Sequence, residues 1–395
     1  MATTDHMPAG RGYDTSLGYF SHLNNYWNAA GKCVGVNGTS VKIYDFWDTT
    51  HGGEPWDVGC DETSIECYEE TKFEQRATKI IAEHDPSKPL FLNYDFHLVH
   101  EPLQVPTAYF DAFDFIATSA AGDFKHNRQY YHAMVKFADD VLGNLTNALK
   151  AKGMWKNTLV VLQSDNGGPS WAGSSHTANN YPLKGSKVSN WEGGVRTNAF
   201  VAGPFLTKYA RPTRVLGSKL TGLISIADWY STFCALAGVP AVDPRAAAAH
   251  LPPLDSINMW PYIVGEAAAS PRTTIHMDAG VLVQGDLKYL KNESALACWH
   301  GPQYPNATGP DASDCTRVES CDPCMYNLTA DPNEHVNLAH DPAHAQAVER
   351  LATLSSKLDE TIFKPNRGMP DPEACYQAIK YGEGKSWGFW GPWIA

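Results

Sequence analysis

The sequence predicts an α/β fold for residues 1–265 and a smaller α+β domain for residues 266–395. Short apolar runs that stop abruptly at glycine and polar residues indicate buried strands. Long segments with apolar residues at helical spacing lie between these runs and indicate helices that pack on a sheet. With 395 residues and 43% hydrophobic content, the chain is long enough to bury a substantial core.

Two long helices are predicted in the first half of the chain. The first covers residues 71–85, where Thr71 and Glu74 have the spacing of a capping box. The second covers about residues 127–152 and ends before Gly153, a residue that favours helix termination. The apolar faces of the two helices are formed by Phe73, Ala77, Ile80 and Ile81, and by Tyr131, Met134, Ala138, Val141, Leu145 and Leu149.

Strands are predicted on both sides of the second helix, at residues 90–96 and 159–164. The later run is apolar, β-branched in its middle and followed at once by turn residues, which is typical of a fully buried strand of a parallel sheet. Strand, helix and strand in this order form the crossover unit of such a sheet. Residues 198–204 predict a further strand, and residues 225–240 predict a helix that ends at Gly238.

The pattern changes in the last third of the chain. Residues 239–255 are rich in alanine and proline and predict a surface loop. Beyond about residue 266 we expect short strands, such as those within residues 280–292, and one amphipathic helix. Its apolar face would comprise Val348, Leu351, Leu354, Leu358 and Ile362.

Composition excludes some classes of partner. The net charge of -12 argues against a general nucleic-acid or membrane-surface binder, because phosphate groups attract clustered Lys and Arg. The start MATTDHMPAGRG lacks the features of a signal peptide. Nine cysteines and five glycosylation sequons nevertheless favour a secretory or lysosomal route, so we expect that the beginning of the protein is missing. The sequons begin at Asn37, Asn144, Asn292, Asn306 and Asn327.

Four of the cysteines lie close together, at Cys298, Cys315, Cys321 and Cys324. The segment CDPC could form the core of a zinc site, but the irregular spacing fits disulfides better. The disulfide pairing is left open.

A carboxylate and an amide follow the strand predicted at residues 159–164. Asp165 and Asn166 offer hard oxygen atoms, which suit Ca²⁺ or Mg²⁺, and the two glycines after them allow a tight turn. The alternative is an Asx turn with a purely local role. If the strands are parallel neighbours, His100, which follows the strand at 90–96, lies at the same edge, and the loop with Lys187 follows directly. A metal, a cation and a titratable group around one point would suit a tetrahedral oxyanion, although each residue alone has a simpler role as a loop histidine or a solvated lysine.

Five segments, in this order, resemble those of the type I sulfatases, in particular the arylsulfatase B branch: RGYDTSLGYF, LVHEPLQVP, SDNGG, PLKGSKVSNWEGGVR and MYNLTADPNEHVNLA. The resemblance implies an alkaline-phosphatase-like α/β domain, with a largely parallel sheet flanked by helices, and a small C-terminal domain with an antiparallel sheet. It also implies that Asp165 and Asn166 bind Ca²⁺, that His100 and Lys187 contact the sulfate, and that the substrate is a sulfated small molecule or glycan.

The sequence departs from this family in its first part. The Asp-Asp pair that completes the calcium site, the Cys-x-Pro-x-Arg motif whose cysteine becomes formylglycine, and the Gly-Lys-Trp-His-Leu-Gly segment are all absent. Cys321 has Pro323 two positions later but Met325 where arginine is needed. We therefore expect a chain that lacks its N-terminal catalytic segment, is inactive as written and is unstable alone.

Two alternatives remain open. A non-catalytic relative would keep the oxyanion pocket and bind sulfated glycans without turnover. A phosphoesterase of the same superfamily is disfavoured, because zinc enzymes of this fold tend to have a histidine where this chain has Asn166.

Overall fold

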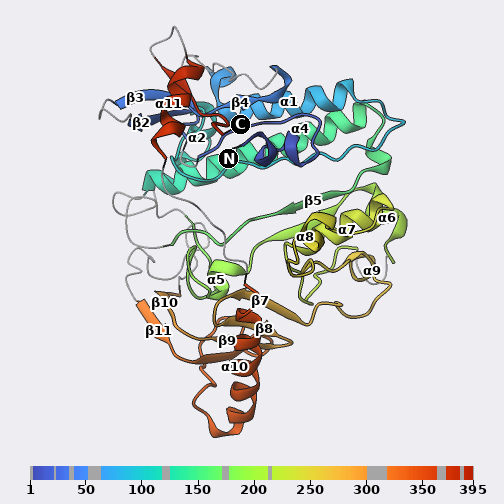
Figure 1. Cartoon of the computed structure of the whole chain (residues 1–395), viewed down its shortest axis with the longest axis vertical. Coiled ribbons are helices and arrows are strands. Elements are labelled where there is room, and N and C mark those ends of the chain that lie inside the picture. Colours follow the sequence, from blue (N-terminus) through green and yellow to red (C-terminus); the bar gives the residue numbers. More distant parts are fainter. Residues whose placement is uncertain are drawn as a thin grey trace. The chain divides into compact units, whose positions relative to one another are not determined.

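The computed structural model describes residues 3–21, 24–34, 40–51, 64–117, 125–170, 178–211, 216–299, 318–362, 371–382 and 387–394. The chain forms two compact units, one of Met1–Met154 with Asn366–Ala395 and one of Trp155–Pro365 (Figure 1). The domain boundary predicted at residue 265 lies inside the second unit and stays a prediction. No helix in the described ranges is both long enough and apolar enough to cross a membrane.

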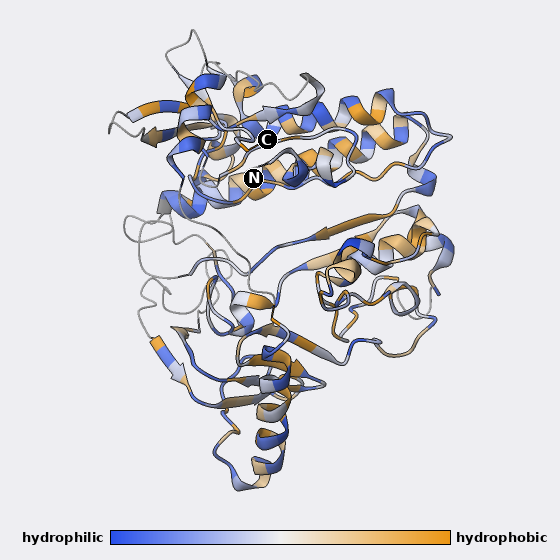
Figure 2. Cartoon of the chain, in the orientation of Figure 1, coloured by the Kyte–Doolittle hydropathy of each residue, from blue (hydrophilic) through white to orange (hydrophobic). Residues whose placement is uncertain are grey.

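Two long helices dominate the first unit. Helix α1 (Glu69–Glu83) packs against α4 (Lys125–Ala151), and the shorter α2 (Thr107–Asp111) and α3 (Asp114–Ala117) also contact α4. Figure 2 shows apolar and hydrophilic residues alternating along α1 and α4, as expected for helices with one buried face. Their common core comprises Tyr26, Tyr68, Ala77, Ile81, Val105, Ala133, Met134, Phe137, Val141 and Leu145. Both predicted helices are confirmed.

The predicted capping box of the first helix is wrong. Helix α1 begins at Glu69, with Tyr68 as its N-cap residue and no side-chain cap. Thr71 therefore lies inside the first turn and cannot cap it. Two consecutive glutamates, Glu69 and Glu70, begin the helix instead.

The strand predicted at residues 90–96 is not formed. The segment is extended, and its even-numbered residues are half-buried while Phe91, Asn93 and Asp95 are exposed. Leu90, Leu92, Tyr94 and Phe96 pack on the α1–α4 core. No strand of the described ranges pairs with this segment, so alternating burial arises here from packing on helices.

A small mixed sheet completes the first unit. In this sheet, β3 (Ser40–Tyr44) pairs antiparallel with β2 (Ala30–Val34) and parallel with β13 (Gly388–Phe389). A separate two-stranded sheet consists of β1 (Leu17–Gly18) and β4 (Trp47–Asp48), which pair antiparallel. A disulfide between Cys33 and Cys375 joins β2 to α11 (Pro372–Tyr381) across 342 residues of sequence.

In the second unit, β5 (Val160–Gln163) and β6 (Ala199–Ala202) confirm two predicted strands, but they pair antiparallel and β5 is only half-buried. The predicted parallel crossover unit is therefore wrong for these residues, since an apolar run does not reveal the direction of its partner. The same unit contains α5 (Glu192–Val195), α6 (Pro204–Tyr209), α7 (Asp228–Ala237), α8 (Pro244–Ala248) and α9 (Trp260–Ile263), of which α6, α7 and α9 share an apolar cluster with β5 and β6. Helix α7 ends at Gly238, whose φ of 70° is left-handed, as predicted.

The predicted antiparallel sheet of the C-terminal region is confirmed. Its strand order is β12 (Cys324–Asn327), β9 (Leu287–Leu290), β8 (Val281–Gln284) and β7 (Thr274–Asp278), and every pair is antiparallel. A separate ladder joins β10 (Glu293–Leu296) to β11 (Val318–Cys321).

The two faces of this sheet pack on different elements. Helix α10 (Ala345–Asp359) covers one face through Leu351, which clusters with Leu282, Tyr289 and Met325. The predicted amphipathic helix is thus confirmed, although Ile362 lies beyond its end. The other face packs on Trp191, which immediately precedes α5, together with Val281, Leu290, Cys321, Cys324 and Tyr326. The second face therefore supports the segment that carries Lys187.

Candidate functional site

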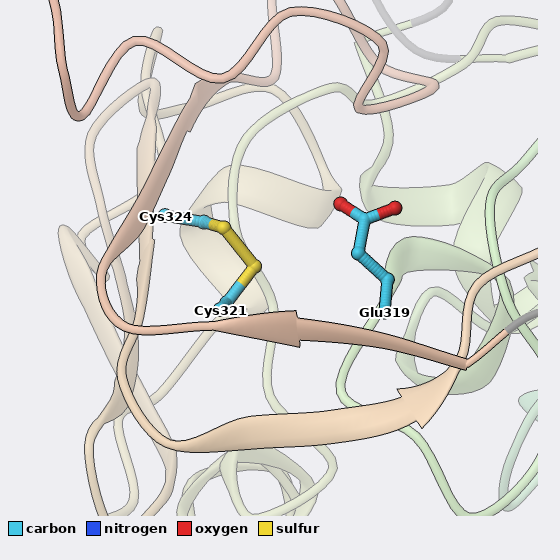
Figure 3. A group of neighbouring side chains, drawn as sticks. All are labelled: Glu319, Cys321 and Cys324. Atoms are coloured by element: carbon cyan, nitrogen blue, oxygen red, sulfur yellow. A yellow bond between two sulfur atoms is a disulfide. The ribbon is translucent and has the colours of Figure 1, made fainter.

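The cysteine cluster is a disulfide rather than a metal site. Cys321 and Cys324 are bonded to each other, with Cα atoms 5.1 Å apart and both side chains buried. With Glu319 they form the one group of potential metal ligands found in the described part of the chain, with ligand atoms within 4.8 Å of one another (Figure 3). The disulfide leaves no thiolate for zinc. The prediction that the CDPC segment forms a disulfide rather than a zinc site is therefore confirmed. Cys298 is also disulfide-bonded, and Cys315 lies outside the described residues.

The predicted calcium ligands lie in the loop directly after β5. Asp165 is exposed and Asn166 is half-buried. The Asn166 N–H donates to Oδ1 of Asp165 at 2.8 Å, and the Ser164 hydroxyl donates to the Asn166 carbonyl at 2.9 Å. The loop therefore presents a carboxylate to solvent and is held by its own short hydrogen bonds. Both side chains offer oxygen donors, the chemistry that Ca²⁺ prefers.

The glycines of this loop allow close contact with the loop of Lys187. The Gly167 N–H donates to the Gly194 carbonyl at 2.9 Å, and the Lys187 N–H donates to the Gly168 carbonyl at 3.2 Å. A Cβ atom on Gly167 would lie 1.7 Å from the carbonyl oxygen of Gly193, so no other residue fits there without moving the backbone. The backbone thus joins the loop of Asp165 and Asn166 to the loop of Lys187.

Lys187 lies on a tight turn with buried ends. The Ser189 N–H donates to the Ser186 carbonyl at 3.1 Å, and the Ser189 hydroxyl donates to the same carbonyl at 2.7 Å. Ser186 and Ser189 are buried, whereas Lys187 is half-buried and Val188 is exposed. The turn therefore brings Lys187 and Val188 toward the surface, while Ser186 and Ser189 hold its two ends in the protein interior.

Lys184, three residues earlier, has a structural role. Its ammonium group lies 3.7 Å from the ring centroid of Trp191 and 5.4 Å from that of Tyr326, and it pairs with Glu319 at 2.9 Å. The side chain is 1% exposed. Cation–π contacts and an ion pair thus stabilise this lysine inside the fold.

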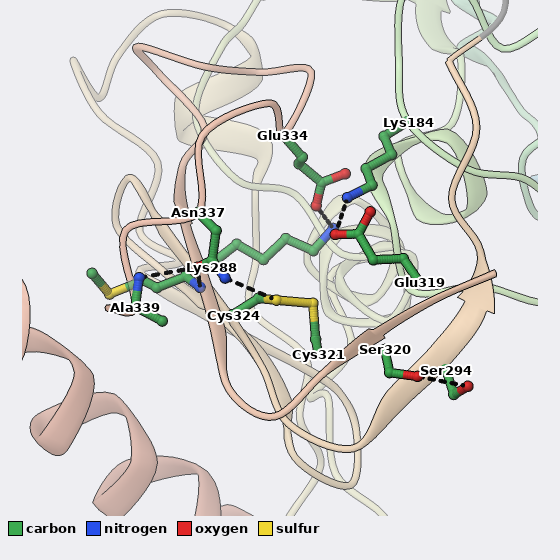
Figure 4. The surroundings of a disulfide bond; sticks show 11 residues. Lys184, Lys288, Ser294, Glu319, Ser320, Cys321, Cys324, Glu334, Asn337 and Ala339 are labelled. Atoms are coloured by element: carbon green, nitrogen blue, oxygen red, sulfur yellow. Dashed lines mark hydrogen bonds and ion pairs between the residues drawn. A yellow bond between two sulfur atoms is a disulfide. The ribbon is translucent and has the colours of Figure 1, made fainter. Parts of the chain in front are cut away.

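A buried ion network holds the segment that follows Lys187, and Figure 4 shows two of its members, Lys288 and Glu334. The Lys288 ammonium lies 2.8 Å from Glu192 Oε1 and 2.9 Å from Glu334 Oε1. The Glu192 N–H donates to Glu334 Oε2 at 2.7 Å, and all three side chains are buried. Burial raises the pKa of Glu334, and Lys288 opposes that shift. Sequence reasoning missed this network, although a lysine on the buried face of the strand LKYL could have indicated it.

His100 belongs to the first unit, where Tyr26 holds its loop. The Tyr26 hydroxyl bonds to the carbonyls of His97 and His100 at 2.9 and 3.0 Å, and the His100 N–H donates to the His97 carbonyl at 3.0 Å. Nδ1 of His100 lies 2.9 Å from the Glu101 carbonyl. Asp165, Asn166 and Lys187 belong to the second unit, so the convergence of His100 with them remains a prediction.

Buried acids at the start of α1 also fix the His100 loop. Glu70 Oε1 accepts hydrogen bonds from the N–H groups of His97 and Leu98 at 2.8 and 3.2 Å, and Glu69 Oε2 lies 2.6 Å from His97 Nδ1. Burial raises the pKa of Glu69 and the pKa of Glu70 to about 8. Burial lowers the pKa of His97 to about 4. At neutral pH these buried groups are therefore mostly uncharged, and sequence reasoning did not single them out.

These pKa shifts predict a stability that falls as pH rises above about 4.5, and falls more steeply above about 6.5, where the opposing contribution of His97 has ended. A carboxyl with a pKa of about 8 in the fold and an ordinary value of 4.5 stabilises the fold fully below pH 4.5, and that stability is lost as pH rises through 8. Each such group contributes a slope of up to about 1.4 kcal/mol per pH unit. His97 has the opposite sign, and its contribution is lost as pH falls from 6.5 through 4.

Glu70→Gln tests this prediction, because glutamine keeps an acceptor for the two N–H groups but cannot ionise. Melting temperatures between pH 6.5 and 8.5 should fall less steeply for this variant than for the wild type. Glu83→Gln, at an exposed position on the same helix, should follow the wild type. Parallel curves for Glu70→Gln and wild type would refute the assigned protonation of Glu70.

Comparison with known proteins identifies the family of this chain. The Sulfatase family model matches residues 7–239. Arylsulfatase J of Mus musculus is 29% identical over 417 residues, covering 98% of this chain and 62% of the relative, and arylsulfatase A of Homo sapiens is 28% identical over 295 residues, covering 71% and 51%. The chain thus spans about half to three fifths of the length of these curated relatives.

Solved structures show the same fold. The crystal structure of Ps i-CgsB has a TM-score of 0.65 at 23% identity and covers 92% of this chain and 70% of its own. The sulfatase PsFucS1 from Pseudoalteromonas sp. has a TM-score of 0.54 at 20% identity and covers 81% and 59%. The predicted alkaline-phosphatase-like α/β fold is confirmed. Since the family match extends over more than half of the chain, this protein belongs to the sulfatase family.

Proposed function

We propose that this chain supplies calcium and sulfate ligands for a sulfatase that hydrolyses sulfate esters on carbohydrate in a calcium-dependent reaction. The observation that carries the proposal is the backbone connection between two loops. Hydrogen bonds from Gly167 to Gly194 and from Lys187 to Gly168 join the backbone of the loop that carries Asp165 and Asn166 to the backbone of the segment that carries Lys187. Oxygen ligands beside a cation form a surface that suits a sulfate group.

Each predicted site residue has a role that its chemistry allows. Asp165 and Asn166 supply two oxygen donors toward Ca²⁺, which takes six to eight. When bound, Ca²⁺ neutralises negative charge on the ester. Lys187 attracts the sulfate oxygens, and its half-buried stem limits the positions that its ammonium group can reach. His100 binds the ester or donates a proton to the leaving oxygen.

The formylglycine nucleophile of the family does not fit any cysteine of this sequence. Cys-x-Pro-x-Arg is absent, and Cys321, the nearest partial match, is bonded to Cys324. Hydrolysis is therefore proposed for the whole protein, and binding of Ca²⁺ and sulfate is proposed for the residues described above.

The same ligand set also suits a second candidate function. A non-catalytic relative would use the same residues to bind sulfated glycans without turnover. Ps i-CgsB has been solved in complex with k-i-k-neocarrahexaose, which supports a saccharide as the ligand class for this fold. A phosphoesterase is a weaker alternative, because Asn166 offers an amide where a zinc enzyme needs a better ligand.

We also propose a lysosomal or secreted location and membership of the arylsulfatase B branch of the family. Three of the predicted sequons lie at described positions: Asn144 on α4, Asn292 after β9 and Asn327 at the end of β12. Asn37 and Asn306 lie outside the described residues. The disulfides Cys33–Cys375 and Cys321–Cys324 agree with an oxidising compartment.

Two substitutions test the assigned roles by calorimetric titration. Lys187→Ala should weaken the binding of inorganic sulfate at least tenfold, because about 1.4 kcal/mol or more of charge attraction is removed. Asp165→Ala should abolish Ca²⁺ binding at this loop. Lys219→Ala, at an exposed position of the same unit, should change neither affinity. An unchanged Ca²⁺ affinity in Asp165→Ala would reject the metal assignment.

A further inference from the structure

The residue after Lys187 has an unfavourable backbone conformation. Val188 has a φ of 63°, in the left-handed region, and its side chain is 81% exposed. It occupies the third position of the turn from Ser186 to Ser189, where a positive φ favours glycine or asparagine. A β-branched residue at a positive φ is strained by contacts between its Cβ substituents and the backbone.

Neighbouring contacts hold the turn in this conformation. Ser186 and Ser189 are buried and bonded to each other through the Ser189 hydroxyl and N–H. The Ser186 hydroxyl also accepts the Ser170 N–H at 3.0 Å. With both ends fixed, the strain at Val188 persists in the folded protein. It is not offset by packing, because the valine side chain is almost fully exposed.

Contact with the ligand explains why a strained and exposed apolar side chain lies beside the lysine that binds it. Lys187 and Val188 are the two central residues of the same turn, with Cα atoms about 3.8 Å apart, so Val188 is the exposed apolar side chain next to the lysine that holds the ester. The substituent of a sulfate ester is the organic group bonded through the ester oxygen. The hydrocarbon face of a sugar or aromatic ring offers the apolar surface that a valine can cover.

We propose that Val188 is a specificity-determining residue that packs on the hydrocarbon face of the ring carrying the sulfate. The inference rests on the proposed function, since it takes Lys187 as the sulfate ligand. Lys187 binds the charged group common to all sulfate esters, and Val188 discriminates between esters with a ring and esters without one.

Two monoanionic esters separate these contributions. Para-nitrophenyl sulfate carries a ring, and methyl sulfate carries none, so the ratio of their dissociation constants measures the ring contact alone. Val188→Ala and Val188→Gly should bind para-nitrophenyl sulfate about fivefold more weakly than the wild type, because part of the apolar contact is removed. Binding of methyl sulfate should be unchanged. Val242→Ala, at a 60% exposed position of the same unit, serves as the matched control.

Melting temperatures show whether the turn survives substitution. Val188→Gly should melt at or above the wild-type temperature, because glycine relieves the strain at a positive φ, whereas Val242→Gly should melt lower. If both Val188 variants keep the wild-type ratio of the two dissociation constants, the inference is overturned. If the wild type binds neither ester, or if Lys187→Ala leaves methyl sulfate binding intact, the proposed function fails first and the inference fails with it.

Discussion

Lys288→Ala is expected to lower the free energy of unfolding by about 3–5 kcal/mol, the typical cost of removing one partner from a buried ion pair. Lys288 is fully buried between Glu192 and Glu334. Without its ammonium group, the two buried carboxylates would lose the counterion that they share, and Glu192 would keep only Arg196, 3.8 Å away. Both would have to bind a proton, move to solvent or repel each other.

The cost should depend on pH. Burial raises the pKa of Glu334, so protonation of this carboxyl at low pH removes part of the uncompensated charge, and Lys288→Ala should be less destabilising at pH 5 than at pH 8. Urea denaturation at the two pH values measures this difference. Lys291→Ala removes an exposed lysine just after the same strand and should stay within about 0.5 kcal/mol of the wild type.

A triple variant checks the mechanism. Lys288→Met combined with Glu192→Gln and Glu334→Gln removes the charges together and should recover most of the lost stability. If the triple variant is as unstable as Lys288→Ala, loss of side-chain packing rather than unpaired charge explains the effect.

Arg272→Ala is expected to lower the free energy of unfolding by a similar amount, about 3–5 kcal/mol, because it leaves the buried carboxylate of Asp228 without its arginine partner. The Arg272 guanidinium donates to both oxygens of Asp228, at 2.8 and 2.6 Å, and Asp228 is fully buried. Hydrogen bonds to Asp228 raise the pKa of Arg272 further, so the arginine stays charged. This pair joins α7 to the segment just before β7.

Arg272→Lys separates charge from geometry. Lysine keeps the positive charge but cannot form the two parallel hydrogen bonds. The Arg272→Lys variant should therefore be more stable than Arg272→Ala and less stable than the wild type. Arg245→Ala, at an exposed position on α8, is the control and should be nearly neutral. Equal stability of Arg272→Ala and Arg245→Ala in urea denaturation would contradict the assigned role of the pair.

Local patterns in the sequence predicted several elements correctly. Helix α4 and the end of α7 at Gly238 follow from apolar spacing and from the left-handed preference of glycine, both of which act over a few residues. The direction of strand pairing was not predictable in this way. Strand β5 has the run of a buried parallel strand but pairs antiparallel with β6, because the choice of partner depends on residues far away in sequence.

In the candidate site too, features that depend on a few neighbouring residues were predicted, and features that depend on distant residues were not. Asp165, Asn166 and Lys187 were identified from short segments, and the two loops that carry them are joined by backbone hydrogen bonds. The buried support of the Lys187 loop was missed because Lys288 lies 96 residues from Glu192 in sequence. The conformation of Val188 was missed because valine has no local preference for a positive φ.

The measurement that tests the central claim most directly is the affinity for inorganic sulfate with and without Ca²⁺. If Asp165 and Asn166 hold Ca²⁺ beside Lys187, Ca²⁺ should strengthen sulfate binding, and sulfate should strengthen Ca²⁺ binding by the same factor. Asp165→Ala should remove this coupling, while Lys187→Ala should weaken sulfate binding whether or not Ca²⁺ is present. Sulfate binding that is independent of both Ca²⁺ and Lys187 would contradict the account.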